Sequence, residues 1–250
     1  MNKQLLEKIE MIRDKTLQDV TSLCKMFDWD QKIDLRIHSI SKLIYIQMGL
    51  HTVFCYASLE LENEEMMKRM KSQLISNIND VSRDQLFGPF GQLIKQGFVA
   101  SLFFSIESTL RVYCLRLDPD YHITSQGNPK KRQFHEIYKH LLDNILNFKD
   151  TELINLKPTI QMISNLKNTL HNNGIHYGLI PPAPSESVEI TYRQNEYKFI
   201  PSERVDFVSW DLLLDLCDDT RSIFFHLSKH HKIAYIDGII IDPSVDSKLL

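Results

Sequence analysis

The sequence predicts a mainly α-helical protein, an up-and-down helical bundle with a small β-hairpin before its last helix. Apolar residues recur at the three- and four-residue spacing of amphipathic helices along most of the 250 residues. The chain holds only 8 glycines and 9 prolines, which argues against long loops and against an all-β fold. One short stretch near the end alternates apolar and polar residues, as paired strands do.

The composition is that of a soluble globular protein, with 43% hydrophobic and 24% charged residues. A net charge of −3 argues against a strongly basic coat for nucleic acid but does not exclude a local basic patch. The four cysteines are far apart and form no CxxC, which favours reduced, buried thiols. The N-terminal residues do not have the layout of a signal peptide. We therefore expect a cytoplasmic protein without a membrane span.

The first third of the chain predicts helices over residues 3–26, 33–60 and 62–79. The second of these carries no charge from Leu43 to Leu59, which approaches the length of a membrane span. Because Gln47 and His51 interrupt this run, and because charged residues flank it closely, we interpret it as a buried core helix.

A break is expected at Gly88–Gly91, where the sequence reads Gly-Pro-Phe-Gly. The next helix should run from Leu93 to Leu117 and end at Asp118-Pro119, since proline cannot continue the hydrogen-bond ladder. Two further helices are expected over residues 131–146 and 151–171, the second with a kink at Pro158 and a stop at Asn172-Asn173-Gly174.

The last part of the chain combines strand and helix patterns. Residues 181–184 predict a stiff connector, and the alternation over residues 188–199 predicts one β-hairpin. A strong helix should cover residues 209–229, and residues 234–241 fit a short terminal strand. The expected organisation is a helical layer of residues 1–85 packed on a helical core of residues 86–180, with residues 181–250 completing the same domain.

The helix before the Asn-Asn-Gly stop carries ionisable residues on its apolar face. At about 100° per residue, Lys167 and His171 lie in line with apolar residues such as Leu153. Two ionisable groups in such a position need a partner, a ligand or a path to water. Asn168 lies further round the same helix, where it can hydrogen-bond the same ligand.

Glu107 and Arg111 form a complementary pair on the preceding long helix. They are four residues apart and lie beside its apolar stripe. If the two helices pack antiparallel, we expect this pair to approach Lys167 and His171. Glu107 would then orient the His171 ring or neutralise Lys167.

With both segments in view, the chain resembles the HEPN superfamily. The resemblance rests on Ser-Ile-Glu107-Ser-Thr-Leu-Arg111 and, two helices later, on Leu-Lys167-Asn168-Thr-Leu-His171-Asn-Asn-Gly. The family motif is an Arg, commonly followed by a polar residue such as Asn, and then a His after four to six intervening residues. Here Lys167 stands in place of the Arg, with three residues before His171. The resemblance covers roughly residues 90–180.

The resemblance implies an all-α domain, often dimeric, that acts without metal or cofactor. Many members are endoribonucleases of toxin–antitoxin and phage-defence systems, and others bind RNA or nucleotides without cleavage. In cleavage, a His moves the proton of the ribose 2′-OH and a cation stabilises the phosphate. We therefore expect a homodimer that acts on RNA or a nucleotide, with Lys167, Asn168, His171, Glu107 and Arg111 at its site and an antitoxin or other protein as a further partner.

Three interpretations stay open: a metal-independent endoribonuclease, a module that binds RNA, a nucleotide or a protein without cleavage, and a helical scaffold for dimerisation. Lys167 and His171 also fit an ordinary helix end, because the helix dipole favours cations there. That dipole also favours the imidazolium form of His171, which suits a proton donor or phosphate ligand better than a base.

A second group of residues predicts phosphate binding. Lys130, Lys131 and Arg132 make the most basic stretch of the chain, although a solvated helix end explains them too. Polar residues beyond the helix stop extend the same expectation: Asn172, His176 and Tyr177.

No metal site is expected. His226 and His230 are four residues apart, as zinc ligands can be, but no acidic residue completes a set nearby. The acidic residues from Asp211 to Asp219 fit a solvated face near the start of their helix. The chain also lacks a Gly-rich phosphate loop and a GxSxG motif.

Overall fold

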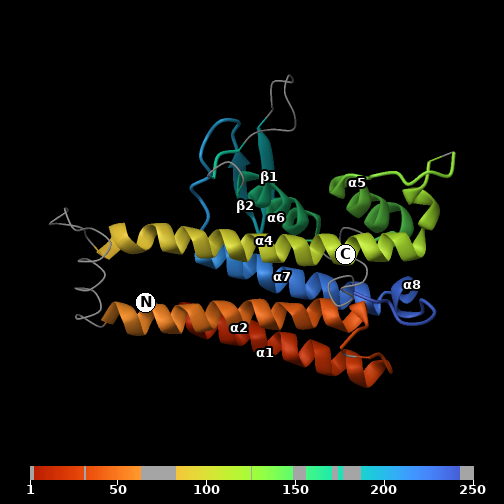
Figure 1. Cartoon of the computed structure of the whole chain (residues 1–250), viewed down its shortest axis with the longest axis horizontal. Helices are drawn as coiled ribbons and strands as arrows, with labels where there is room; N and C mark the ends of the chain where they lie inside the picture. The colour runs from red at the N-terminus through yellow and green to blue at the C-terminus, as the bar shows by residue number, and fades with distance from the viewer. Residues whose placement is uncertain are drawn as a thin grey trace.

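The computed structural model confirms a mainly α-helical protein with one antiparallel β-hairpin (Figure 1). It describes residues 3–30, 32–62, 83–124, 126–148, 156–170, 174–176 and 187–242. The elements are α1 (Lys3–Met26), α2 (Leu35–Glu62), α4 (Arg83–Leu117), the 3-10 helix η1 (Pro119–His122), α5 (Phe134–Lys139), the π-helix η2 (His140–Ile145), α6 (Leu156–Leu170), β1 (Val188–Tyr192), β2 (Asn195–Phe199), α7 (Trp210–Lys229) and α8 (His231–Ala234).

Four long helices, α1, α2, α4 and α7, make up the central bundle (Figure 1). Helix α1 packs on α2 and α7. Helix α2 also packs on α4 and α7, and α4 packs on α7. In Figure 1, α5 and α6 lie on the side of α4 opposite to α2, and the hairpin stands beside α6. The elements that carry the candidate site residues therefore share one side of the bundle.

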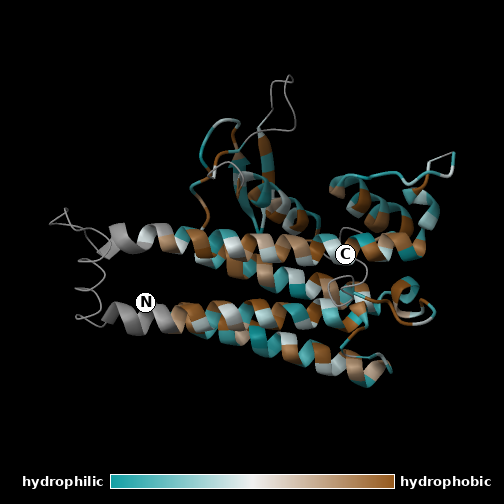
Figure 2. Cartoon of the chain, in the orientation of Figure 1, coloured by the Kyte–Doolittle hydropathy of each residue, from teal (hydrophilic) through white to brown (hydrophobic). Residues whose placement is uncertain are grey.

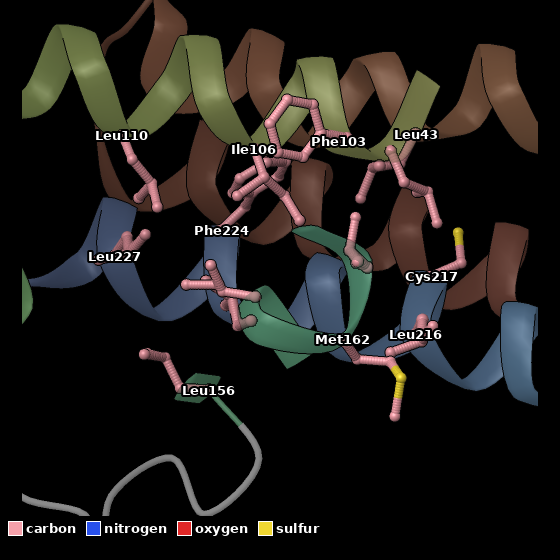
Figure 3. Packing of buried hydrophobic residues seen from close by; sticks show 14 of the residues in the cluster. Leu43, Phe103, Ile106, Leu110, Leu156, Met162, Leu216, Cys217, Phe224 and Leu227 are labelled. Atoms are coloured by element: carbon pink, nitrogen blue, oxygen red, sulfur yellow. The ribbon is translucent and has the colours of Figure 1, made fainter. Parts of the chain in front are cut away.

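Buried apolar side chains from these helices form one cluster. Figure 3 shows part of it, with side chains of α2, α4, α6 and α7 meeting in the interior: Leu43, Phe103, Ile106, Leu110, Met162 and Phe224. Full burial of one such side chain stabilises the fold by about 1.5–3 kcal/mol relative to exposure. Packing therefore fixes how α6 lies on α4. The loop after α4 is mostly hydrophilic, whereas hydrophobic residues recur along α2 and α4 (Figure 2).

The two most apolar helices are core helices. In α4, residues Phe90–Leu117 are long and apolar enough to cross a membrane by length and composition, but 56% of their most apolar window is buried within the protein. The uncharged run of α2 likewise buries Leu43, Leu50 and Phe54, as the sequence predicts for a core helix. Such burial is what the core helix of a soluble protein shows.

Several predicted boundaries are confirmed. α1 has the expected limits, and Leu117 is the last residue of α4 before Asp118-Pro119. Ser209 precedes α7, and its hydroxyl accepts a hydrogen bond from the Leu212 backbone N–H at 3.1 Å. Gly174 has a φ of +84°, the left-handed conformation expected beyond the helix stop.

The break predicted at Gly88–Gly91 is wrong, because α4 begins at Arg83 and continues through this segment. A proline in a helix removes one backbone hydrogen bond, and this one lies only two turns from the helix start. The buried face that begins at Phe98 outweighs that loss. The predicted helix over residues 62–79, the connector at 181–184 and the stop residues Asn172 and Asn173 lie outside the described residues.

The helix predicted over residues 131–146 begins later and changes type. It starts at Phe134 as α5, where the Glu136 carboxylate accepts a hydrogen bond from the Gln133 backbone N–H at 2.7 Å. From His140 it continues as the π-helix η2. Pro158 lies in the first described turn of α6, where proline is tolerated, and the kink predicted there stays a prediction because residues 151–155 lie outside the described residues.

The terminal strand predicted over residues 234–241 is wrong. The short helix α8 ends at Ala234, and only Ile241 makes a β-bridge, to Asp34. The Arg36 guanidinium instead donates hydrogen bonds to backbone carbonyl oxygens of this segment, to those of Ala234 and Ile236 at 3.2 Å each and to that of Gly238 at 2.9 Å. A side chain therefore replaces a neighbouring strand.

Candidate functional site

Glu107 and Arg111 form the predicted ion pair on the surface of α4. Arg111 Nη2 and Nε donate to Glu107 Oε1 at 2.6 and 2.9 Å. Both side chains are partly exposed, 37% for Arg111 and 23% for Glu107. Both hydrogen bonds use one carboxylate oxygen, and the pair remains within reach of solvent.

Arg111 also joins this pair to the basic stretch before α5. Its Nη1 donates to the backbone carbonyl of Arg132 at 3.2 Å. Lys130 and Lys131, which precede Arg132, are exposed. The fold thus places the Glu107/Arg111 pair next to the basic stretch, a contact that the sequence does not predict.

Arg132 itself is held by several neighbours. Its Nε donates to the Tyr121 carbonyl at 3.0 Å, and its guanidinium lies 4.1 Å from the centre of the Tyr121 ring. Its Nη1 is 3.6 Å from Glu136. Arg132 therefore fixes the loop on α5, and Lys130 and Lys131 are the more accessible cations of the stretch.

Lys167 lies where α6 packs on α4. Its Nζ is 5.0 Å from the centre of the Phe103 ring, one helical turn before Glu107. A cation over a ring face is attracted by the ring quadrupole, which holds the ammonium at this edge of the core. Phe103 is thus the described contact of Lys167 on α4, and the predicted approach of Lys167 to Glu107 and Arg111 stays a prediction, while Asn168 is exposed on α6.

His171, Asn172 and Tyr177 lie outside the described residues, so the predicted approach of Glu107 to His171 stays a prediction. His176 is described and is only 3% exposed. Burial lowers its pKa, and neither ring nitrogen has a hydrogen-bond partner among the described residues. In this conformation His176 offers no surface to a phosphate.

His122 is a titratable residue near the site that the sequence analysis does not single out. Burial lowers its pKa first, and the positive charges of Arg111 and Arg132 lower it further. Its Nε2 is buried without a hydrogen-bond partner among the described residues. The nearby His140 is held differently, because its Nε2 donates to Asp118 at 2.8 Å and its ring stacks on Tyr121 at 3.7 Å.

Phe104 is a second residue that the sequence analysis omits. It lies off the apolar stripe of α4 and is 60% exposed. The signal for it is present in the sequence, because an aromatic residue that falls outside the buried periodicity of a core helix must face away from that core.

The acidic residues of α7 are ion-paired across elements, not simply solvated as the sequence suggests. Lys8 of α1 pairs with Asp211 and Asp215 at 3.1 and 2.9 Å, and Arg193 of the hairpin turn pairs with Asp215 and Asp219 at 2.8 and 2.7 Å. These pairs tie α1 and the hairpin to α7. Within the described ranges, no group of His, Cys, Asp and Glu could hold a metal ion.

The cysteines that the structure describes are free thiols. Cys114 and Cys217 are buried, and burial raises the pKa of these thiols to about 11 and about 12. Cys24 and Cys55 are only partly buried.

A scan against protein-family models, a search of curated proteins and a search of solved structures each found no match to this chain.

Proposed function

We propose that this chain is an HEPN-like protein that acts on RNA and holds the phosphate backbone along one strip of its surface. The strip is made of Lys167 on α6, Arg111 on α4, and Lys130 and Lys131 before α5. We call it the cationic strip. The observation that carries the proposal is the hydrogen bond from Arg111 to the Arg132 carbonyl, which joins two basic regions far apart in the sequence.

The charge balance of the strip supports an anionic ligand. It holds four cations, and Glu107, the acidic residue paired with one of them, already accepts two hydrogen bonds from Arg111. Lys130 and Lys131 are exposed and belong to a hydrophilic loop (Figure 2). A local basic surface of this kind attracts phosphates even on a chain with a net charge of −3.

The test is RNA binding by Lys130→Ala/Lys131→Ala, followed by fluorescence anisotropy of a labelled oligoribonucleotide. The control is Lys3→Ala/Lys25→Ala, which removes two exposed lysines from α1 and changes the net charge equally. We expect the first variant to bind RNA more weakly and the control to bind like wild type. If both variants lose RNA affinity equally, the loss reflects net charge alone. That result would exclude the cationic strip as the RNA-binding surface.

Metal-independent RNA cleavage is the second candidate function. The observation that favours it is the contact of Lys167 with Phe103 on α4, the residue one turn before Glu107. His171 follows Lys167 by four residues in the sequence. In this mechanism His171 exchanges protons with the ribose 2′-OH and the leaving oxygen, while Lys167 stabilises the phosphate charge.

Cleavage predicts that wild-type protein degrades mixed RNA in EDTA and that His171→Ala reduces the rate by about 100-fold or more, the usual contribution of a general acid or base. His135→Ala, at an exposed position of α5, should leave the rate unchanged. RNA that stays intact with wild-type protein, although it binds, would assign the chain to the non-cleaving modules.

A homodimer, a cytoplasmic location and an antitoxin or other protein partner belong to the same proposal. Sedimentation of the purified protein would give its mass in solution, and a strict monomer would contradict the dimer.

A further inference from the structure

Phe104 is a large exposed aromatic residue beside the cationic strip. A single exposed apolar residue is common on protein surfaces and by itself indicates nothing. Its neighbours give this one a specific environment.

Phe104 is supported by the same ring that lies under Lys167. The Phe103 and Phe104 rings are 5.9 Å apart at an interplanar angle of 67°, an edge-on contact. The Lys167 ammonium lies 5.0 Å from the centre of the Phe103 ring. The exposed ring and the cation thus both contact Phe103, which is itself buried.

Arg111 lies on the same side of α4 as Phe104. The two residues are seven apart, which is about two helical turns, roughly 20° of rotation and about 10 Å along the helix axis. The exposed aromatic side chain therefore has Lys167 on the α6 side and Arg111 further along α4.

We propose that Phe104 stacks on an unpaired base of single-stranded RNA while Lys167 and Arg111 hold the neighbouring phosphates. This inference rests on the proposed function and specifies its substrate class. Every base has a π face, so stacking on an aromatic side chain tolerates any sequence but requires an unstacked base. A base within an RNA duplex is covered on both faces and cannot use Phe104.

A second copy of this chain is the other partner that could cover Phe104. Leu93 lies on the same side of α4 and is 64% exposed, so an interface between two copies would use both residues. The Lys167 ammonium over the adjoining Phe103 ring, and Arg111 about two turns further along α4, favour RNA at Phe104. The experiment separates the two partners.

The experiment measures binding of one oligoribonucleotide as a single strand and as a duplex, by fluorescence anisotropy. We expect Phe104→Ala to bind the single strand at least about fivefold more weakly than wild type, on the scale of losing one stacked base, and to bind the duplex unchanged. Leu93→Ala, matched in exposure and helix face, should bind both forms like wild type. Phe104→Trp should retain binding, and its added indole fluorescence, read against the chain's two tryptophans, should be quenched by the single strand.

Other outcomes separate this inference from the proposed function. If Phe104→Ala binds the single strand like wild type while Lys130→Ala/Lys131→Ala is weakened, stacking is overturned and RNA binding stands. If no variant changes RNA binding, both ideas fail. If Phe104→Ala and Leu93→Ala both convert an oligomer to a smaller species in solution, the surface formed by these two residues is an interface between copies. Stacking is then again overturned.

Discussion

His176 is buried in surroundings that favour its neutral form. Desolvation lowers its pKa from the ordinary 6.5, and its ring nitrogens have no hydrogen-bond partner among the described residues. Its ring packs beside Phe199, with centroids 5.4 Å apart. Its backbone is bonded on both sides, because its N–H donates to the Glu203 carbonyl and its carbonyl accepts from the Ser202 N–H. His176 thus packs, in its neutral form, against the last residue of β2 and the segment that follows it.

The burial of His176 predicts a pH dependence of stability. In the unfolded chain the ring binds a proton below the ordinary pKa of 6.5, whereas the folded chain resists protonation until the lowered pKa is reached. The free energy of unfolding should therefore fall as the pH drops below 6.5 and should carry no such penalty above it. Urea unfolding at several pH values should show a smaller fall for His176→Gln than for wild type. The exposed His135→Gln should keep the wild-type fall, and an equal fall in both variants would contradict this assignment.

The basic stretch shows what a sequence can and cannot tell about single residues. Lys130, Lys131 and Arg132 are equivalent in the sequence. In the structure Arg132 stacks on Tyr121 and pairs with Glu136, contacts that depend on how the loop folds back on α5. Residue type therefore predicts where charge gathers, and only tertiary packing decides which of the charges is accessible.

At the scale of elements, the hairpin carries backbone strain that can be relieved. Its turn residues Arg193 and Gln194 have φ values of +45° and +68°, the left-handed conformation of a type I′ turn. Arg193 keeps its place through ion pairs with α7, whereas Gln194 is exposed. The turn thus favours glycine at Gln194.

Gln194→Gly should raise the free energy of unfolding by about 0.5–1 kcal/mol, because glycine adopts positive φ without steric cost. Glu196→Gly, at an exposed strand position without positive φ, should lower it by a similar amount. Thermal or urea unfolding would measure both. Stabilisation by both substitutions, or by neither, would contradict the strain at the turn.

The element predictions succeeded where long apolar periodicity dominates and failed where a single contact decides. α1, the end of α4, α7 and the hairpin follow from pattern and end signals. The break at Gly88–Gly91 failed because packing further along α4 outweighs one lost hydrogen bond. The terminal strand failed because the Arg36 guanidinium donates hydrogen bonds to its carbonyl oxygens. Arg36 lies 200 residues before Ile236, one of these acceptors. Neither compensation is visible in local sequence.

At the scale of the whole molecule, the four-helix core leaves α4 as the shared support of the candidate site. It packs on α2 and α7 within the bundle, α6 packs on both α4 and α7, and α5 packs on α4. Arg111 on α4 thereby meets the basic stretch before α5, and Lys167 on α6 packs on the Phe103 ring of the same helix. The pairing of Glu107 with Arg111 was predictable from their spacing on one helix, and the contact of Arg111 with the basic stretch was not.

The salt dependence of RNA binding tests the central claim most directly. A protein that binds phosphates releases counterions, so the logarithm of its association constant falls linearly with the logarithm of salt concentration. We predict such a fall for wild type and a slope reduced by about 0.7 for each phosphate contact that Lys130→Ala/Lys131→Ala removes on single-stranded RNA. A wild-type affinity that does not respond to salt, or a variant slope equal to that of wild type, would contradict the cationic strip.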